Sequence, residues 1–375
     1  MSEEQHQKLN LPRRTVVAGA AWSIPTILVA TTAPLAAASP CRTTVTFQAT
    51  APAAAGIDSF TTPFTVPAGV TKVNFTVVGA PGGGDVPNRL TGGLGGIVTG
   101  ELSVAPGTIL QLQVGQGGTG GPGPSPYVAS TTGGRGFGNG GDSIPVVAGE
   151  RAHAGSSGGG GSAILVGTNP LVVAGGGGGS PTYNISPIIA LTGPPQSYGQ
   201  GGSPGDPADD LLVQTTLAAN GHTDQLSGPA GGNASGSTPG AGGIATSVPT
   251  EGPITYFGTN NGLPGSGRNG GNGVSVAGAL PSTSWRKSSP GGGGGYAGGG
   301  SGSAQRAEWG IAPGNHASTR LIIDTAGAGG AGSNFVSSVP VGTSAVTSSL
   351  EEIPTGVGPA GPVRVPGSIT LTYCA

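Results

Sequence analysis

The chain has 375 residues and a formal net charge of −2, with 79 glycines and 34 prolines. Charged residues make up only 8 %, which disfavours disorder of the highly charged kind. The glycines follow no strict every-third pattern, which excludes collagen. The basic residues are scattered, so we expect no nucleic-acid partner, because such a surface needs clustered positive charge.

The first 38 residues have the layout of an export signal. Arg13 and Arg14 precede a weakly apolar stretch, and small residues that include Ala36 and Ala38 follow it. This pattern predicts a twin-arginine signal peptide over residues 1–38, with the twin-arginine translocase as the export partner. An uncleaved membrane anchor is the alternative, although two prolines within the stretch disfavour it.

Residues 39–375 are expected to form one glycine-rich domain with no further membrane span. Short segments of this domain alternate apolar and polar residues, which is typical of half-buried strands. The predicted strands are residues 43–47, 60–66, 72–77, 94–104, 108–114, 162–166, 171–174, 320–323 and 368–373. The turn residues Gly167 to Pro170 predict a hairpin between two of them. No segment keeps a helical period, so the fold class is all-β and a sandwich is favoured.

Runs of glycine separate these strands. The longest are residues 82–84, 158–161, 175–179, 291–295 and 298–300. They are either flexible linkers or packed polyglycine II helices, which have three residues per turn and no internal hydrogen bonds. We favour packed helices, because each run directly adjoins a strand and their bare backbones can approach until lateral hydrogen bonds form. Residues 180–289 are less regular and are expected to be partly loops.

Cys41 and Cys374 lie at the two ends of the exported chain. An oxidising compartment favours a disulfide between them, which would stabilise the fold by roughly 5 kcal/mol on the chain-entropy model. The bridge requires the first and last strands to be neighbours. Two unpaired or intermolecular thiols are the alternative.

The order of strands and glycine runs resembles a known pattern. It is carried by the segments Phe64–Thr71, Val77–Gly84, Ile109–Gly117, Gly158–Ala163, Leu171–Gly178 and Gly291–Tyr296, followed by the ending at Cys374. The succession is similar to bacterial secreted glycine-rich domains and to the extracellular glycine-rich region of anaplastic lymphoma kinase and leukocyte tyrosine kinase receptors. That resemblance implies a jelly-roll-like sandwich, similar to tumour necrosis factor, with an inserted bundle of polyglycine II helices. In the receptors this region binds a cytokine-like ligand, but no ligand-contact motif and no kinase motif is found here.

Signals for chemistry are weak. Ser157 and Ser203 each have the flanking glycines of a nucleophile elbow, but such glycines are common here and no helix is predicted to follow either serine. His153, His222 and His316 are isolated, and the acidic segment Asp206–Asp210 lacks the spacing of a calcium loop. We therefore expect no catalytic residues, no metal and no cofactor.

Aromatic residues set among glycines are the remaining candidates for binding. Trp285, Tyr296 and Trp309 would stack on a sugar or a peptide if exposed, and would cap the ends of glycine helices if buried. The leading hypothesis is a non-enzymatic structural, adhesive or ligand-displaying module of the cell envelope or extracellular space. Its partner would be an extracellular protein or glycan, and oligomers are possible. The alternatives are a secreted hydrolase on a glycine-rich scaffold and a disordered glycine-rich matrix protein.

Overall fold

The fold is taken from a computed structural model. It describes residues 43–48, 61–85, 90–121, 130–143, 152–186, 196–216, 223–245, 254–276, 286–310, 320–338, 346–349 and 366–374. Within these ranges the chain forms strands and irregular stretches and no helix. The predicted all-β fold class is therefore confirmed for the described residues. The predicted signal, including Arg13, Arg14, Ala36 and Ala38, lies outside them.

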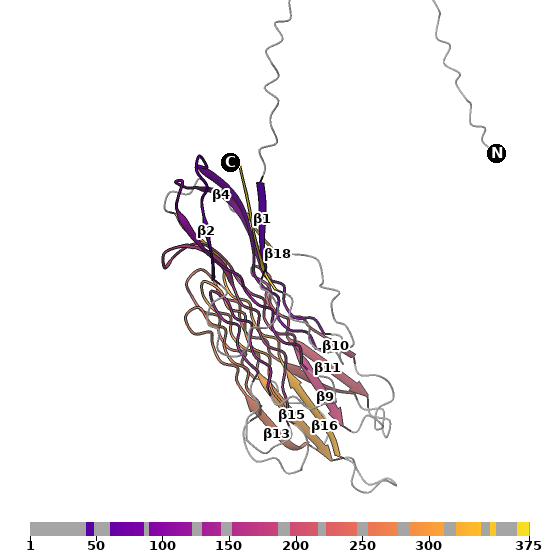
Figure 1. Cartoon of the computed structure of the whole chain (residues 1–375). Coiled ribbons are helices and arrows are strands. Elements are labelled where there is room, and N and C mark those ends of the chain that lie inside the picture. The colour runs from indigo at the N-terminus through magenta and orange to yellow at the C-terminus, as the bar shows by residue number, and fades with distance from the viewer. Residues whose placement is uncertain are drawn as a thin grey trace, which may run out of the picture. The chain divides into compact units, whose positions relative to one another are not determined.

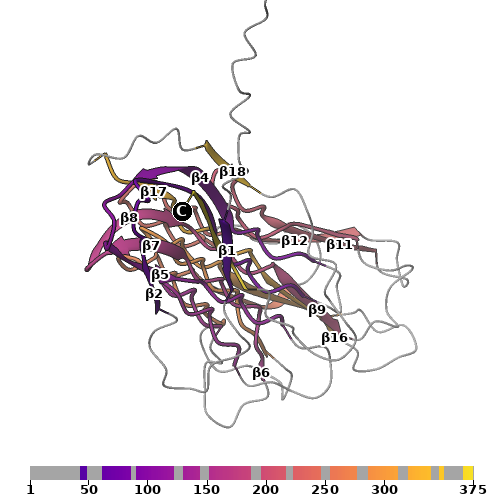
Figure 2. The same cartoon turned by 45° about the horizontal axis from the view of Figure 1, so that its top comes forward.

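Two five-stranded antiparallel sheets form the frame of the molecule. The first has the order β1 (Thr43–Gln48), β19 (Ser368–Tyr373), β3 (Lys72–Val78), β4 (Gly96–Ser103) and β18 (Val346–Ser349). The second has the order β17 (Phe335–Val336), β8 (Asn169–Ala174), β7 (Ser162–Val166), β5 (Ile109–Gln113) and β2 (Thr61–Thr65), and its strands are seen side by side in Figure 2. Each of the nine predicted strands overlaps an observed strand, and β7 and β8 form the predicted hairpin.

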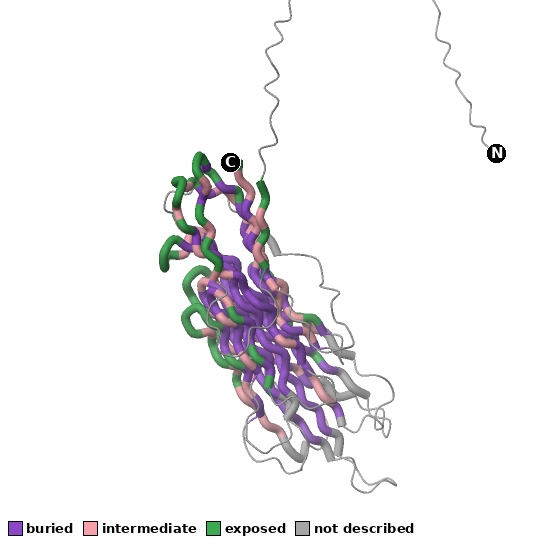
Figure 3. The backbone as a smooth tube through the Cα atoms, viewed as in Figure 1, coloured by how far each residue is buried: buried purple, intermediate pink, exposed green. Residues whose placement is uncertain are grey.

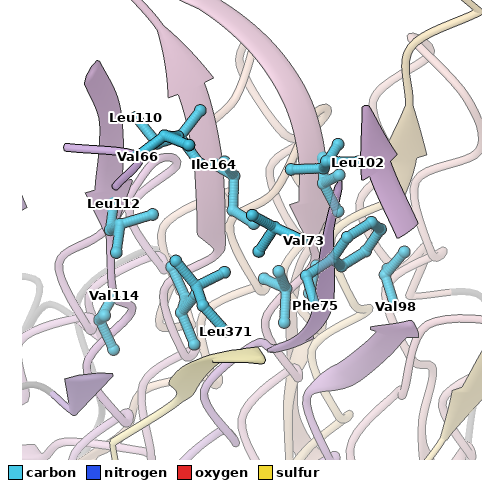
Figure 4. Close-up of a cluster of buried hydrophobic side chains, with 14 of the residues drawn as sticks. Val66, Val73, Phe75, Val98, Leu102, Leu110, Leu112, Val114, Ile164 and Leu371 are labelled. Atoms are coloured by element: carbon cyan, nitrogen blue, oxygen red, sulfur yellow. The ribbon is translucent and has the colours of Figure 1, made fainter. Parts of the chain in front are cut away.

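The two sheets enclose one apolar core, which makes them a β-sandwich. In β3 the alternation of the sequence places Val73, Phe75 and Val77 on the buried face. Leu110 and Leu112 of β5 meet them from the second sheet, as Figure 4 shows. Burying such side chains supplies about 1.5–3 kcal/mol each, so this core is the main apolar contribution to the frame.

A second, smaller group of sheets occupies the part of the sequence that looked less regular. One sheet has the order β10 (Gln196–Tyr198), β11 (Leu211–Thr216) and β12 (Thr223–Gly228). The other has the order β13 (Ile254–Asn260), β15 (Ala304–Gly310), β16 (Arg320–Ala326) and β9 (Thr182–Ser186). Leu211, Val213 and Leu226 pack against Ala307 and Ile323 between these sheets. Residues 180–289 thus contain several strands and contribute to a second core, which the sequence had not suggested.

A short two-stranded parallel sheet pairs β14 (Arg286–Lys287) with β6 (Ala152–His153). Irregular glycine-rich stretches connect all these strands, and Figure 1 shows them running between the sandwich strands and β9, β13, β15 and β16. Figure 3 shows that many of these stretches are buried along their length. Burial of backbone without strand pairing requires other partners for its N–H and C=O groups.

Candidate functional site

The glycine stretches are bound to one another by backbone hydrogen bonds. Gly176 and Gly179, three residues apart, donate their N–H groups to the carbonyls of Gly294 and Gly291 at 2.7 and 2.9 Å. Carbonyls three residues apart behave in the same way, since Gly176 and Gly179 accept from Gly332 and Gly329 at 3.0 Å each. The hydrogen-bonding direction therefore repeats every three residues along this stretch.

One glycine stretch, residues 175–179, has neighbours on every side. Its N–H and C=O groups are hydrogen-bonded to the backbone of six other stretches, except the N–H of Gly175, which donates to the Asn334 Oδ1 at 2.7 Å. The six stretches contain residues 80, 93–96, 159, 202, 291–294 and 329–332. Residues 291–295 are surrounded in a comparable way. Six neighbours around a rod are the arrangement of close packing, so the described glycine stretches form a bundle; we call these stretches the glycine bundle.

The close approach of neighbouring stretches in this bundle depends on the absence of a side chain on glycine. A Cβ atom built on Gly293 would lie 2.1 Å from the carbonyl oxygen of Gly176. One built on Gly178 would lie 1.9 Å from the carbonyl oxygen of Gly329. Both distances are far inside van der Waals contact, so only glycine permits the lateral hydrogen bonds at these positions.

At four positions where the residue on the neighbouring stretch is not glycine, a serine side chain completes the hydrogen bonding. In each such pair, which we call a serine clamp, the serine N–H donates to the carbonyl of a residue on the next stretch, and the serine Oγ accepts that residue's N–H. The pairs are Ser157 with Thr119, Ser289 with Val274, Ser301 with Leu263 and Ser333 with Ala297. Both backbone groups of the partner are thereby satisfied although its side chain needs space.

Asparagines make a related contact, which we call an asparagine clamp. The asparagine Oδ1 accepts the N–H of one residue on the next stretch, and the N–H of the residue after the asparagine donates to the carbonyl of that same residue. The clamps are Asn233–Ala234 on Ala331, Asn269–Gly270 on Asn139, and Asn272–Gly273 on Asp142. These polar side chains therefore extend the lateral network to the edge of the bundle.

The two serines considered as nucleophiles belong to this network. The Ser157 side chain is fully buried; its Oγ donates to the carbonyl of Thr132 at 2.7 Å and accepts the N–H of Thr119 at 2.7 Å. The Ser203 Oγ accepts the N–H of Leu94 at 2.9 Å. Both hydroxyls thus satisfy backbone groups of neighbouring stretches.

Of the three candidate aromatic residues, the structure describes the side chain of one. Tyr296 is half-buried and its ring stacks on Phe335, with centroids 4.0 Å apart and planes at 9°. Both rings pack with Phe137 on the outward residues of β7 and β8, and the guanidinium of Arg268 lies 4.1 Å over the Phe137 ring. Trp285 and the side chain of Trp309 lie outside the described residues. The structure therefore brings Tyr296 into an aromatic cluster that covers the second sheet.

The other candidate ligands do not gather into a site in the described part of the chain. His222, His316 and the side chain of His153 lie outside it, while Asp206 and Asp209 are exposed. Asp210 accepts the N–H of Ala230 at 2.8 Å. The described ranges contain no group of three or more His, Cys, Asp or Glu residues able to hold a metal ion. Nor does any helix in those ranges have the length and apolar character to cross a membrane.

A buried group of charges was not foreseen from the sequence. Arg306 and Glu308 in β15 are 0 % exposed and alternate with Ala307, which faces the second core. Their side chains therefore point to the opposite face, where the Arg306 Nε donates to the Glu308 Oε1 at 3.0 Å and the Arg306 Nη1 lies 3.4 Å from the Asp324 Oδ1. Opposite charges at alternate positions of a strand are the only hint in the sequence.

The first and last strands are neighbours, as the cysteine prediction required. β1 and β19 are antiparallel, with Thr43 opposite Tyr373. Cys374 follows Tyr373 directly, and Cys41, which lies outside the described residues, precedes Thr43 by two positions. Because two residues span at most about 7 Å, this register is compatible with a bridge between the two ends.

Comparison with known proteins adds no family: no protein-family model matches the chain, and no curated protein matches it.

Proposed function

We propose that the glycine bundle consists of packed polyglycine II helices clamped by a jelly-roll-like sandwich similar to that of tumour necrosis factor. The three-residue repeat of the hydrogen bonds supports this assignment, because polyglycine II has three residues per turn and directs its N–H and C=O groups sideways. Two facing antiparallel sheets support the sandwich class. Lateral hydrogen bonds then compensate part of the entropy that glycine loses on ordering.

This architecture favours a structural role. We infer that the protein is exported through the twin-arginine route and acts without catalysis, as a rigid structural, adhesive or ligand-displaying module of the envelope or extracellular space. The observation that carries the proposal is the enclosure of residues 175–179 by six hydrogen-bonded neighbours. A backbone held on all sides resists bending and offers proteases no extended segment to bind.

Hydrogen exchange of the exported protein tests this role. The amides of Gly176, Gly179 and Gly293 are expected to exchange far more slowly than the same sequences in free peptides, because they donate to buried backbone carbonyls. The amides of the exposed turn residues Gly236 and Ser237 serve as the fast internal reference. Peptide-like exchange at the three glycines would instead support the disordered matrix protein.

A second experiment separates a binding module from a hydrolase. The exported protein would be assayed against peptide, ester and glycoside substrates and pulled down with purified envelope polysaccharides. We expect retention on a polysaccharide and no turnover. Turnover that disappears in Ser157→Ala or Ser203→Ala, with the fold intact, would favour the hydrolase.

The export and disulfide proposals have direct chemical tests. N-terminal sequencing of exported material is expected to begin near Ser39. Alkylation of the native protein without reductant is expected to label no thiol, and labelling after reduction should reach both Cys41 and Cys374. Two thiols that react in the native protein would show that the two cysteines form no bridge.

A further inference from the structure

The glycine bundle contains a chemical hazard. Asparagine followed by glycine is the dipeptide most prone to deamidation, because glycine has no side chain to hinder attack by its backbone nitrogen. That nitrogen bonds to the asparagine Cγ, the Cγ–Nδ2 bond breaks and ammonia leaves. Water then opens the resulting succinimide to aspartate or isoaspartate. Four such dipeptides lie in the described residues, beginning at Asn139, Asn261, Asn269 and Asn272.

In all four dipeptides the attacking nitrogen is already engaged. The N–H of Gly140 donates to the carbonyl of Gly134 at 2.8 Å, and that of Gly262 donates to Gly243 at 2.8 Å. The N–H groups of Gly270 and Gly273 donate to the carbonyls of Asn139 and Asp142 at 2.9 and 2.7 Å. Each nitrogen is thus directed at a neighbouring carbonyl oxygen.

The group under attack is also held in all four. The Oδ1 of Asn139 accepts the N–H of Gly136 at 3.2 Å, and the Oδ1 of Asn261 accepts the N–H of Ala245 at 3.0 Å. In two of the three asparagine clamps, Asn269 and Asn272 each accept a backbone N–H at 3.0 Å. Deprotonation of the glycine nitrogen breaks its hydrogen bond, and the hydrogen bond at Oδ1 restrains the rotation of the asparagine side chain that would bring Cγ to that nitrogen.

We propose that the folded bundle suppresses deamidation at Asn139, Asn261, Asn269 and Asn272 by holding both the nucleophile and the electrophile of each site in hydrogen bonds. Reaction then proceeds only from locally opened molecules, so its rate falls in proportion to the opening equilibrium. The suppression depends only on these hydrogen bonds and not on the proposed ligand or location.

Suppression matters to the bundle because the product would damage it. Isoaspartate adds one methylene to the backbone, which shifts the three-residue hydrogen-bonding repeat of everything that follows it on that stretch. Aspartate at Asn272 would bring a negative charge next to Asp142, whose N–H the Asn272 Oδ1 accepts. The bundle thus protects the asparagines whose intact side chains its edge needs for hydrogen bonding.

The test uses the full exported protein with an introduced reference site. The variant Ser235→Asn places asparagine before Gly236 in an exposed turn, where the backbone N–H and C=O of Ser235 are hydrogen-bonded to Thr238. Native and guanidinium-unfolded samples would be incubated at mildly alkaline pH, and peptide mapping by mass spectrometry would follow deamidation at each site.

In the native protein we expect the four natural sites that the structure describes to deamidate at least about tenfold more slowly than the site introduced by S235N, as local opening requires. In the unfolded protein all five should react at similar rates, because each is an asparagine before glycine. Natural sites that react as fast as the introduced one in the native protein would overturn the proposal. Natural sites that remain slow in guanidinium would overturn it too, since the fold would then not be the cause.

Discussion

At the scale of single residues, the space beside each glycine differs from one position to the next. Gly293 and Gly121 both lie in glycine stretches and both donate a backbone hydrogen bond, at 2.8 and 2.9 Å. A Cβ on Gly293 would lie 2.1 Å from a backbone oxygen, whereas one on Gly121 would meet its nearest atom at 3.5 Å. Substitutions at these two positions therefore distinguish the effect of close packing from the effect of replacing any glycine.

Gly293→Ala is expected to destabilise the protein by at least about 1–3 kcal/mol, because the added methyl group overpacks the bundle. Gly121→Ala is expected to be neutral or to stabilise by up to about 1 kcal/mol, because it restricts the unfolded chain without a clash. Chemical denaturation of both variants measures the difference. Equal midpoints would mean that the stretches are not packed as described.

The serine clamps make a second prediction at this scale. The Ser333 Oγ accepts the N–H of Ala297 at 3.0 Å and donates to the carbonyl of Gly236 at 2.6 Å. Ser333→Ala leaves the N–H of the buried residue Ala297 without this partner, so we expect a loss of about 1–3 kcal/mol in the free energy of unfolding. Ser237→Ala, in an exposed turn, is the control and should change it by less than about 0.5 kcal/mol.

At the scale of elements, β5 shows how far alternation determines burial. Leu110 is 0 % exposed in the sandwich core, and its neighbour Ile109 is 49 % exposed on the other face. We expect Leu110→Ala to cost about 2–5 kcal/mol, because it leaves a cavity. Ile109→Ala should cost well under half as much by the same denaturation assay; similar costs would contradict the placement of the core.

A buried ion pair in β15 can be compared in the same way with an ion pair on the surface. Arg306 forms its ion pair with Glu308 at 0 % side-chain exposure on both partners, whereas Lys72 and Glu101 pair on the surface at 67 % and 33 %. Arg306→Met removes the cation from buried carboxylates, so a loss of about 3–5 kcal/mol is expected. Lys72→Met should change stability by no more than about 1 kcal/mol. Equal effects in thermal unfolding would show that the Arg306 pair is solvated.

The strands of the sandwich could be predicted because their signal is local. Val73, Phe75 and Val77 alternate with polar residues, and a two-residue period needs no knowledge of the rest of the chain. The second core could not be predicted in this way, since Leu211 and Ile323 meet only after more than a hundred residues have folded back. The burial of Arg306 was hidden for the same reason, because polar residues at alternate positions normally indicate a solvent-facing side.

In the candidate site too, local features could be predicted from the sequence and contacts between distant residues could not. Glycine runs next to strands indicated lateral packing, but the partner of each serine and asparagine depends on which stretches become neighbours. The pairing of Ser333 with Ala297 or of Asn272 with Asp142 has no trace in the spacing of the sequence. The sequence therefore shows these serines and asparagines but does not predict the residues that they bind.

At the scale of the whole molecule, the sandwich and the glycine bundle share continuous chains. β8 ends at Ala174 and residues 175–179 follow at once, and β3 leads directly into Gly79, whose N–H donates to the carbonyl of Gly96 at the start of β4. Since no spacer separates the two parts, opening the core should also release the ends of the glycine stretches.

We therefore expect the sandwich and the bundle to unfold as one cooperative unit, although two-state behaviour is usual only for smaller domains. Leu110→Ala, placed in the sandwich, should lower the exchange protection of Gly176 and Gly293 by the same free energy that it removes from global stability. Conversely, Gly293→Ala should lower the protection of amides in β3 and β5. Hydrogen exchange read by mass spectrometry measures both effects in one set of peptides. If Leu110→Ala left the glycine amides at full protection, the bundle would hold together without its frame, and the clamping role assigned to the sandwich would be wrong.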